Sequence, residues 1–410
     1  MKKDWEIKKL GDLVTQINGL WKGKKEPFIN VAVIRNTNFS KDCKLKLDDV
    51  EYLDVELKQY SSRKLQAGDI IIEKSGGSDK QPVGRPILFN IEDGEYSFSN
   101  FTSTLRIKDV SQVSAEYLQQ YLYFRWLNGD TRNLQSHTTG IHNLDFKAYL
   151  NFDIILPPLK EQKRIVKILD EKFAQLETLK ANAQTNLQNA KDLFQSQLAK
   201  AFSNTTWEKK RLGEVITVLT DFNANGGYAK LDSNVKMYDE PNYAIMVRTT
   251  DLERNDFEHG VKYVDKKAYD MLSKSVIYGN EIIMNKIGSA GKIYLMPCLN
   301  RPATLARNAF LMRFNDVSDV RYIFSYLSSL EGTASIMKHV HGAVTKTITK
   351  DEVRSIEIPL PPLPEQKRIV KELDTLSEKV RQLQEIYTKQ IANCDELKQS
   401  LLQKAFKGEL

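Results

Sequence analysis

The sequence predicts an α+β fold, in which two mixed, mostly-β domains are separated by two long antiparallel coiled-coil helices as a pseudo-twofold internal repeat. Three observations predict it. A segment of eleven residues recurs at an interval of 204 residues with ten identities, and each copy runs into a long stretch without Gly or Pro. Each copy also follows a region of short apolar runs broken by turn residues.

The repeated segment reads PPLKEQKRIVK at residues 157–167 and PPLPEQKRIVK at residues 361–371. The same interval holds without a gap to residues 198–202 and 402–406. The preceding regions match only loosely, as where Trp5, Leu10 and Gly11 correspond to Trp207, Leu212 and Gly213. Near-identical helices and diverged domains indicate one scaffold that presents two related but different surfaces.

The first domain is expected at residues 1–157 and the second at residues 205–361. Strands are predicted from short apolar runs between turn residues, and two longer periodic runs predict helices. The predicted strands include Ile70–Ile72, Pro86–Phe89, Ile154–Leu156, Ile282–Met284 and Ile356–Ile358, and the predicted helices are Ser114–Leu127 and Val320–Leu330.

The long helices are expected as spacers at residues 158–204 and 362–410. The prolines at 157 and 158 end a strand, because proline cannot donate to a ladder, and Pro364 is tolerated in a first helical turn. A 4-3 spacing of apolar residues predicts a coiled-coil seam in each spacer, so we expect the helices to run antiparallel with a domain near each end. The predicted seams are Leu169, Phe173, Leu176, Ala183, Leu187, Ala190, Phe194 and Ala201, then Leu376, Val380, Leu383, Tyr387, Cys394, Leu397 and Leu401.

Composition bounds the function only loosely. Lys and Arg total 60 against 53 Asp and Glu, a mild basic excess that suits nucleic acid and an ordinary soluble protein equally well. Cys43, Cys298 and Cys394 are scattered and form neither a metal-ligand pattern nor a disulfide framework, which fits the reducing cytoplasm. No stretch approaches 18 apolar residues, so we expect neither secretion nor a membrane span.

Catalytic motifs are missing from the sequence. The segment GSAGK at residues 288–292 lacks the spacing of a phosphate-binding loop, and five dispersed histidines do not suggest a metal centre. Nucleophile-elbow, zinc-protease and dinucleotide-binding patterns are absent, as is the Asn/Asp-Pro-Pro-aromatic motif of adenine-N6 methyltransferases. The sequence therefore predicts a chain that is not an enzyme and holds no metal or cofactor.

Polar loops that occupy matching places in the two domains are the candidate DNA contacts. Glycine allows close backbone approach, Lys and Ser bond phosphate oxygens, and Arg and Asn are the residue types that read guanine and adenine edges. Each loop has an alternative interpretation as a hairpin, a capping turn or a surface turn held by a salt bridge. The candidates are Arg35, Asn36, Thr37, Lys74, Ser75, Gly76, Gly77, Ser78, Asn100, His137 and Thr138 in the first domain, and Arg248, Thr249, Thr250, Asn285, Lys286, Ser289, Arg307, Asn308, His341 and Lys346 in the second.

The start of each spacer is the candidate surface for a protein partner. Near identity between the two copies, where the domains have drifted, indicates constraint by a partner that binds twice. The alternative is a capped and solvated helix start. The candidates are Glu161, Gln162 and Arg164, with their copies Glu365, Gln366 and Arg368.

The whole chain resembles the specificity subunit of type I restriction–modification systems, the HsdS family. The resemblance is carried by Trp5 with Leu10 and Gly11, by LPPLKEQKRIV at residues 156–166 and its copy at 360–370, and by the ending KAFKGEL at residues 404–410. In that family the globular domains are target recognition domains and the helices are conserved spacers. The first spacer departs from the second only mildly, with Lys160 in place of Pro364.

The resemblance implies that each domain reads one half of a split site in double-stranded DNA, with an unread gap set by the coiled coil. It implies that the spacers recruit two adenine-N6 methyltransferase (modification) subunits, and that two restriction (motor–nuclease) subunits are optional members of the complex. S-adenosylmethionine, ATP and Mg would then belong to the partner subunits. Two other classes stay open on the residues alone: a coiled-coil scaffold whose domains bind proteins, and a self-contained nuclease or methyltransferase.

Overall fold

The computed structural model describes residues 4–21, 23–79, 81–138, 141–204 and 206–410, and only the backbone of His137 and Thr138. The chain divides into two compact units. The first unit comprises Met1–Gln184 together with Thr388–Leu410, and the second comprises Thr185–Tyr387. Each unit therefore contains one of the two predicted domains and a part of both long helices.

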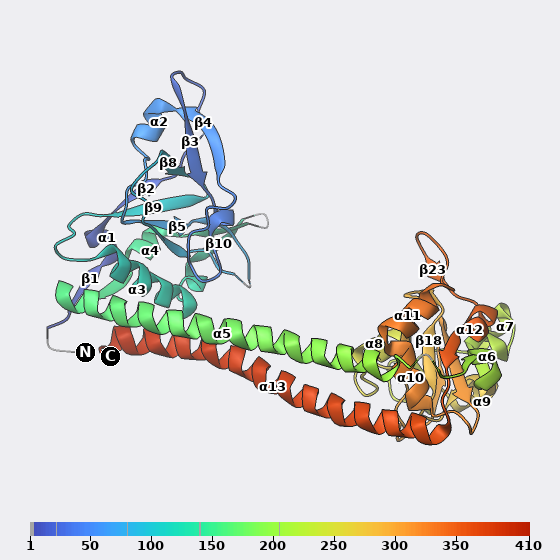
Figure 1. The fold of residues 1–410 in the computed structure, drawn as a ribbon. Coiled ribbons are helices and arrows are strands. Elements are labelled where there is room, and N and C mark those ends of the chain that lie inside the picture. The colour runs from blue at the N-terminus through green and yellow to red at the C-terminus, as the bar shows by residue number, and fades with distance from the viewer. Residues whose placement is uncertain (1–3, 22, 80, 139–140, 205) are drawn as a thin grey trace. The chain divides into compact units, whose positions relative to one another are not determined.

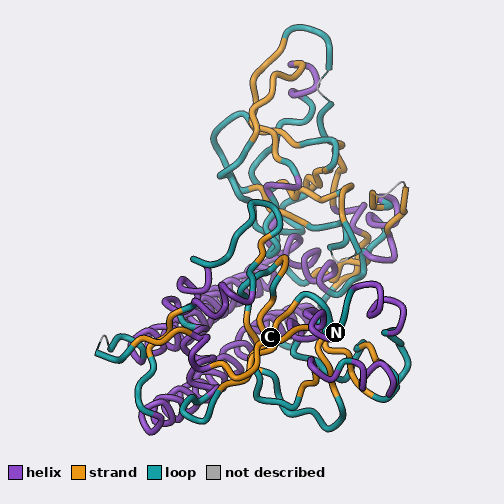
Figure 2. Tube along the Cα trace, turned by 90° about the vertical axis from the view of Figure 1, so that its right-hand side faces the viewer, coloured by secondary structure: helices purple, strands orange, loops and turns teal. Residues whose placement is uncertain are grey.

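The domain of the first unit is a mixture of short strands and helices, as predicted (Figures 1 and 2). Its helices are α1 (Leu10–Leu13), α2 (Leu57–Ser61), α3 (Ala115–Leu127) and α4 (Phe146–Leu150), followed by the long helix α5 (Leu159–Ala201). Its strands are β1 (Glu6–Lys9), β2 (Val14–Asn18), β3 (Phe28–Ile34), β4 (Glu51–Glu56), β5 (Asp69–Glu73), β6 (Ser75–Gly77), β7 (Pro86–Phe89), β8 (Tyr96–Phe98), β9 (Thr102–Ile107), β10 (Gln135–Thr138), β11 (Ile141–Leu144) and β12 (Asp153–Leu156).

The domain of the second unit is built in the same way. Its helices are α6 (Leu212–Val215), α7 (Tyr228–Asn234), α8 (Thr249–Arg254), α9 (Lys266–Met271), α10 (Val320–Ser328), α11 (Leu330–Met337) and α12 (Lys350–Ser355), followed by the long helix α13 (Leu363–Lys407). Its strands are β13 (Lys209–Arg211), β14 (Ile216–Asp221), β15 (Ala244–Val247), β16 (Lys262–Val264), β17 (Val276–Ile277), β18 (Ile282–Asn285), β19 (Ile287–Gly288), β20 (Ile293–Leu295), β21 (Ala303–Leu305), β22 (Ala309–Phe314), β23 (Lys346–Thr347) and β24 (Glu357–Pro359).

The sheet topology repeats between the units more fully than the residues do. The four-stranded sheet β2-β9-β5-β7 of the first unit corresponds to β14-β22-β18-β20 of the second. In the first unit β3 pairs antiparallel with β4 and parallel with β8. In the second unit β15 pairs in the same way, antiparallel with β16 and parallel with β21. In each unit the first strand closes against the last, as β1 with β12 and β13 with β24. The internal repeat is therefore confirmed at the level of whole domains.

The two long helices run antiparallel within the first unit. Lys180 on α5 pairs with Asp395 on α13, with 2.6 Å between Nζ and Oδ1. Nearer the start of α5, Arg164 donates to the carbonyl of Leu410 at 2.8 Å, so the two helices run in opposite directions. Figure 1 shows α3 lying along the first part of α5. Phe406 inserts between these elements, with ring centroids 4.9 Å from Tyr121 and 5.6 Å from Tyr117. The helix pair is thus part of the core of the first domain.

The second unit repeats this arrangement with the helix ends exchanged. Phe202, near the end of α5, packs its ring 5.5 Å from Tyr322 and 5.3 Å from Tyr326 of α10. Because Phe202 and Phe406 are copies of one position, the repeat uses the end of each spacer to complete the core of a domain. Each domain is anchored by the start of one long helix and the end of the other.

Three sequence predictions differ from the structure in detail. Leu397 is 53% exposed, and the seam passes instead through Lys398, whose aliphatic stem is buried and whose ammonium reaches Asp42. The predicted helix Val320–Leu330 is two helices, because Ser329 caps α11 with its side chain and ends α10. The last strand of the second domain begins at Glu357 rather than Ile356, which ends α12.

The described part of the chain contains no helix that is both long and apolar enough to cross a bilayer.

Candidate nucleic-acid interface

The structure brings the predicted polar loops of each domain together. In the first unit β6, which carries Ser75, Gly76 and Gly77, pairs with β11, and β11 pairs with β10, which carries His137 and Thr138. Residues 139 and 140 of the same predicted loop lie outside the described residues. In the second unit the strand after Lys286 pairs with the strand that begins at Lys346. Two segments far apart in sequence therefore form one surface in each domain.

A third predicted loop joins this surface in the first unit. The amide Nδ2 of Asn36 donates to the carbonyl of Ser75 at 2.6 Å, which fixes the turn after β3 against β6. Gly76 has φ +105°, and a Cβ there would lie 3.2 Å from Asn36 Nδ2, so the glycine is needed for both the turn and the close approach. Thr37 next to them is exposed, and Ser78 is exposed at the turn that follows β6.

Lys74 is the cation of this surface without a fixed partner. Its backbone N–H donates to the carbonyl of Phe101, and its carbonyl accepts from Leu144, so both neighbouring strands hold its position. Its ammonium makes no ion pair or hydrogen bond with any other described residue. Partial burial lowers the pKa of Lys74 below its ordinary value, because the charged form loses hydration. An anion bound beside Lys74 would stabilise the charged ammonium and offset the hydration that it loses on burial.

The corresponding lysine of the second unit is already paired. Lys286 Nζ lies 2.7 Å from Asp221 Oδ2, and Lys350 Nζ lies 3.0 Å from the other oxygen of the same carboxylate. Both ammonium groups also lie over the ring of Phe310. Burial alone would raise the pKa of Asp221, but the hydrogen bonds from the two lysines outweigh it and hold the pKa below its ordinary value. Lys286 therefore has a structural partner that its repeat-mate Lys74 does not have.

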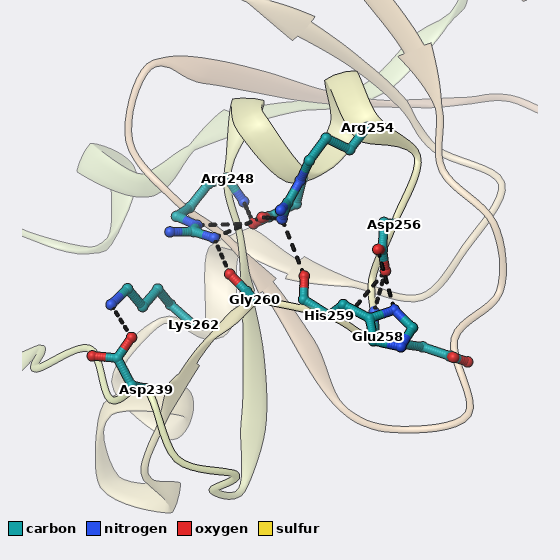
Figure 3. Close-up of polar contacts among 9 residues, drawn as sticks. Asp239, Arg248, Arg254, Asp256, Glu258, His259, Gly260 and Lys262 are labelled. Carbon is teal, nitrogen blue, oxygen red and sulfur yellow. Dashed lines mark hydrogen bonds and ion pairs between the residues drawn. The ribbon is translucent and has the colours of Figure 1, made fainter. Parts of the chain in front are cut away.

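Arg248, at the end of β15 and the start of α8, is held in a fixed position. Arg248 and Arg254, both labelled in Figure 3, each donate to the carboxylate of Asp251, which is fully buried. Arg248 Nη2 donates to Asp251 Oδ1 at 2.7 Å and to the carbonyl of Gly260 at 2.7 Å. The salt-bridged turn that was the alternative interpretation of this motif is thus present, while Thr249 and Thr250 remain partly or fully accessible on the outer side.

The remaining candidates of the second unit lie at the ends of strands that belong to different sheets of its domain. Asn285 is buried at the end of β18, and Asn308, at φ +73°, accepts the backbone N–H of Lys286. Arg307 pairs with Asp232 at 3.0 Å and stacks over Tyr228, which ties it to α7. His341 pairs with Glu352 at 2.7 Å, whereas Ser289 and Lys346 are exposed beside one cavity of about 410 Å³. Ser289 and Lys346 are thus exposed without an ion pair to another described residue, whereas Arg307 is partly exposed and His341 exposed, but both are paired.

Two residues of the first unit support the polar surface although the sequence did not single them out. Asn143 on β11 accepts from the hydroxyl of Ser75 at 2.7 Å. Arg85 lies beneath the surface and forms a two-point ion pair with Glu73, with Nε 2.6 Å from Oε2. Nothing local marks either residue, because both act through partners that are distant in the sequence.

Each of the two spacer starts contains one buried glutamine and one partly exposed Glu–Arg ion pair. Gln162 and Gln366 are fully buried, and each makes three hydrogen bonds to backbone groups of its own unit. That burial removes the two glutamines from the predicted partner surface. Glu161 with Arg164, and Glu365 with Arg368, form matching two-point ion pairs that remain partly exposed.

Each of these exposed pairs borders a hollow within its own unit. Glu161 and Arg164 line a groove of about 480 Å³ together with Lys160. Glu365 and Arg368 line one of about 550 Å³, with Trp207 among its other walls. Among the described residues, no group of His, Cys, Asp and Glu side chains is arranged to hold a metal ion.

Comparisons with known proteins agree with this architecture. The family model described as the type I restriction modification DNA specificity domain matches twice, at residues 2–187 and 204–391. The chain is 27% identical to the type I restriction enzyme EcoKI specificity subunit of Escherichia coli strain K12, covering 99% of this chain and 89% of that protein. It is 22% identical to a putative type I restriction enzyme MjaX specificity subunit of Methanocaldococcus jannaschii, covering 100% and 94%.

Two solved structures share the fold over the full chain. One is the HsdS subunit from Thermoanaerobacter tengcongensis, with a TM-score of 0.64 at 19% identity, covering 100% of this chain and 98% of that one. The other comes from work on complex assembly and conformational transition of the type I restriction–modification system, with a TM-score of 0.78 at 20% identity and coverage of 100% and 99%. Since the family model matches both repeats and nearly all of the chain, the protein belongs to the family of type I restriction–modification DNA specificity subunits.

Proposed function

We propose that each domain of this chain reads one half of a bipartite site in double-stranded DNA, with the unread gap set by the two long helices. The observation that carries the proposal is the repeated topology with diverged loops. Both units bring the same two polar segments together at β6–β11 and β19–β23, yet the side chains there differ. One frame with two different surfaces is what the reading of two different half-sites requires.

The exposed Glu–Arg pairs at the spacer starts support a partner that binds twice. Their geometry is the same in both units, with Arg Nε donating at 2.7 Å in one and 2.8 Å in the other. We assign this surface to two adenine-N6 methyltransferase subunits, with restriction subunits as further members of the complex. The chain itself is non-catalytic in this proposal, and S-adenosylmethionine, ATP and Mg are used by the partners.

The direct test is to reconstitute the chain with the methyltransferase subunits and to map the methylated adenines on genomic DNA. We expect one bipartite sequence with a fixed gap and one methylated adenine in each half. Replacing residues 1–157 by the same domain of a relative is expected to change one half only. Methylation without sequence preference, or binding to proteins alone, would favour the scaffold that was the alternative function.

Lys74→Ala is expected to weaken DNA binding by the complex and to reduce its dependence on salt. A lysine that neutralises one phosphate contributes about 0.9 to the slope of log K against log salt, so the slope should fall by about that amount. Lys286→Ala, its repeat-mate, should change the slope much less, because Asp221 already holds that ammonium. Fluorescence anisotropy with labelled duplexes at several salt concentrations measures both. Equal slopes for the wild type and Lys74→Ala would remove Lys74 from the interface.

A further inference from the structure

A cavity of about 470 Å³ opens in the first domain beside the turn that follows β3. Its floor is apolar and comprises Val33 of β3 with Leu53 and Val55 of β4. Its size lies within the range of about 300–1,000 Å³ that is usual for small-molecule sites. Three of its other lining residues, Arg35, Asn36 and Thr37, are predicted DNA contacts.

Two large aromatic side chains flank the cavity and remain open to solvent. Trp21 is 66% exposed and Phe101 is 42% exposed. Backbone contacts place both of them. Leu20 donates to the carbonyl of Phe98 at 2.8 Å, an approach that needs Gly19, because a Cβ there would meet the carbonyl oxygen of Ser99 at 1.9 Å. The carbonyl of Phe101 accepts from both Lys74 and Ser75, which joins the aromatic wall to the β6 surface.

Three polar atoms of the cavity residues are buried without a hydrogen-bond partner among the described residues. They are Arg35 Nε, Asn36 Oδ1 and Ser99 Oγ. The orientation of the Asn36 amide is set by its Nδ2, which donates to Ser75, so the oxygen is the atom left over. Burying such atoms unpaired is unfavourable, and native proteins rarely keep several in one place. The three atoms are covered by their neighbours, and Arg35 also pairs with Glu51, so a ligand bonds them only after these side chains shift. What the cavity presents directly is two exposed aromatic rings beside an apolar floor and a polar edge.

We propose that this cavity holds a nucleobase that leaves the stack of the DNA bound by the first domain. A base is flat, stacks on aromatic side chains, and carries donors and acceptors on its edge, which matches each class of wall. The proposal rests on the proposed function, because the cavity shares Arg35, Asn36 and Thr37 with the predicted DNA surface. The first domain then recognises its half-site partly by how readily one base pair opens.

The test is a mismatch scan with the complete complex. Single mismatches lower the cost of extruding a base, so a duplex mismatched at the captured position should bind about tenfold more tightly. The scan covers every position of the half-site read by the first domain. A mismatch at the methylated adenine serves as an internal control, since methyltransferases extrude their target base as well. The proposal requires a second tightened position, away from that adenine.

Substitutions of the cavity residues test whether the tighter binding at that second mismatch position depends on the cavity. Trp21→Ala and Phe101→Ala, singly and together, should remove the tightening there and leave it intact at the methylated adenine, while Trp21→Phe should retain most of it. Tyr52→Ala is the matched control: Tyr52 is a 65% exposed aromatic residue on β4 that does not line the cavity. Because Trp21 is largely exposed, the single variant should fold even if the double variant does not.

The outcomes separate this inference from the proposed function. A complex that prefers its half-site but shows no Trp21-dependent tightening overturns the cavity proposal alone. A complex without any sequence preference overturns the proposed function instead. Free adenosine, guanosine, cytidine and thymidine are titrated against the tryptophan fluorescence of the full chain. Quenching that Trp21→Phe abolishes, without any mismatch effect, would assign the cavity to a free nucleoside and also overturn the proposal.

Discussion

Gln162→Ala is expected to destabilise the first unit by roughly 3 kcal/mol, because its side chain bonds three backbone groups. The Gln162 side chain accepts from the backbone N–H of Ser114 and donates to the carbonyls of Gln112 and Pro157, at 2.8 or 2.9 Å. Alanine leaves three backbone groups without this partner, the Pro157 carbonyl in buried surroundings and the other two partly buried, and each such group costs about 1–3 kcal/mol. Urea denaturation followed by fluorescence measures the loss, because Trp5, Trp21 and Trp126 all lie in the first unit.

Gln175→Ala is the control on the same helix. Gln175 is exposed, and among the described residues its side chain hydrogen-bonds with Lys172, so its removal should shift the midpoint very little. Gln162→Glu preserves the shape but turns a carboxylate oxygen toward two carbonyls, and it should be about as damaging as alanine. Gln366→Ala should affect the second unit, reported by Trp207, in the same way. A midpoint for Gln162→Ala that equals that of Gln175→Ala would contradict the role of the buried amide.

Removing one member of the Glu73–Arg85 pair should cost about 3–5 kcal/mol, since the remaining charge stays buried without its partner. The two side chains are 2% and 5% exposed. Arg85 also donates to the carbonyl of Phe39, with Nη1 3.3 Å from the oxygen, and thereby links the end of β5 to the turn after β3. Glu73→Gln and Arg85→Met should therefore loosen the polar surface of the first domain as well as its core. Thermal unfolding and DNA affinity of the same variants measure the two effects.

The double substitution separates loss of the charge pair from loss of packing. Glu73→Leu with Arg85→Met removes both charges and should recover much of the stability lost by either single variant. Burial raises the pKa of Glu73, and Arg85 opposes that shift. Without Arg85 the raised pKa favours the protonated carboxyl in the folded state, so Arg85→Met should be less destabilised at low pH and lose stability as pH rises through that pKa. A pH-independent loss, or a double variant as unstable as the singles, would exclude this account.

The repeat made the helices predictable, but it did not reveal why they repeat. Ten identities in eleven residues located the starts of α5 and α13 to within two residues. Identity alone could not separate Gln162, which holds the fold together, from Arg164, which stays partly exposed. The difference lies in contacts to Gln112 and Ser114, about fifty residues earlier in the chain.

The seam shows a second limit of pattern reading. Hydropathy selects Leu397 at the expected spacing, yet the structure buries the stem of Lys398 instead. A lysine can occupy such a position because its four methylenes pack while its ammonium stays hydrated or paired. Here the ammonium lies 5.0 Å from the centroid of Phe173 and reaches Asp42, which a one-letter hydrophobicity pattern cannot register.

Among the candidate DNA contacts, the sequence predicted which segments occupy equivalent places better than it predicted what each side chain contacts. It placed Lys74 and Lys286 at equivalent points, and the structure keeps them equivalent in the backbone. Their electrostatic surroundings differ because Asp221, which is 65 residues before Lys286, has no counterpart paired with Lys74 among the described residues. Long-range pairing of this kind depends on the completed sheet, so it is invisible until the fold is known.

The first unit is assembled from two separate segments of the chain, and this has a consequence for folding during synthesis. Domains usually fold in the order in which the ribosome produces them. Here the second unit is a continuous stretch, Thr185–Tyr387, whereas the first also needs Thr388–Leu410, which contains Phe406. A nascent chain therefore holds an incomplete first domain, with Tyr117 and Tyr121 not yet covered by Phe406, until residues 388–410 leave the ribosome. A premature stop near the C-terminus would damage the domain made first and spare the one made second.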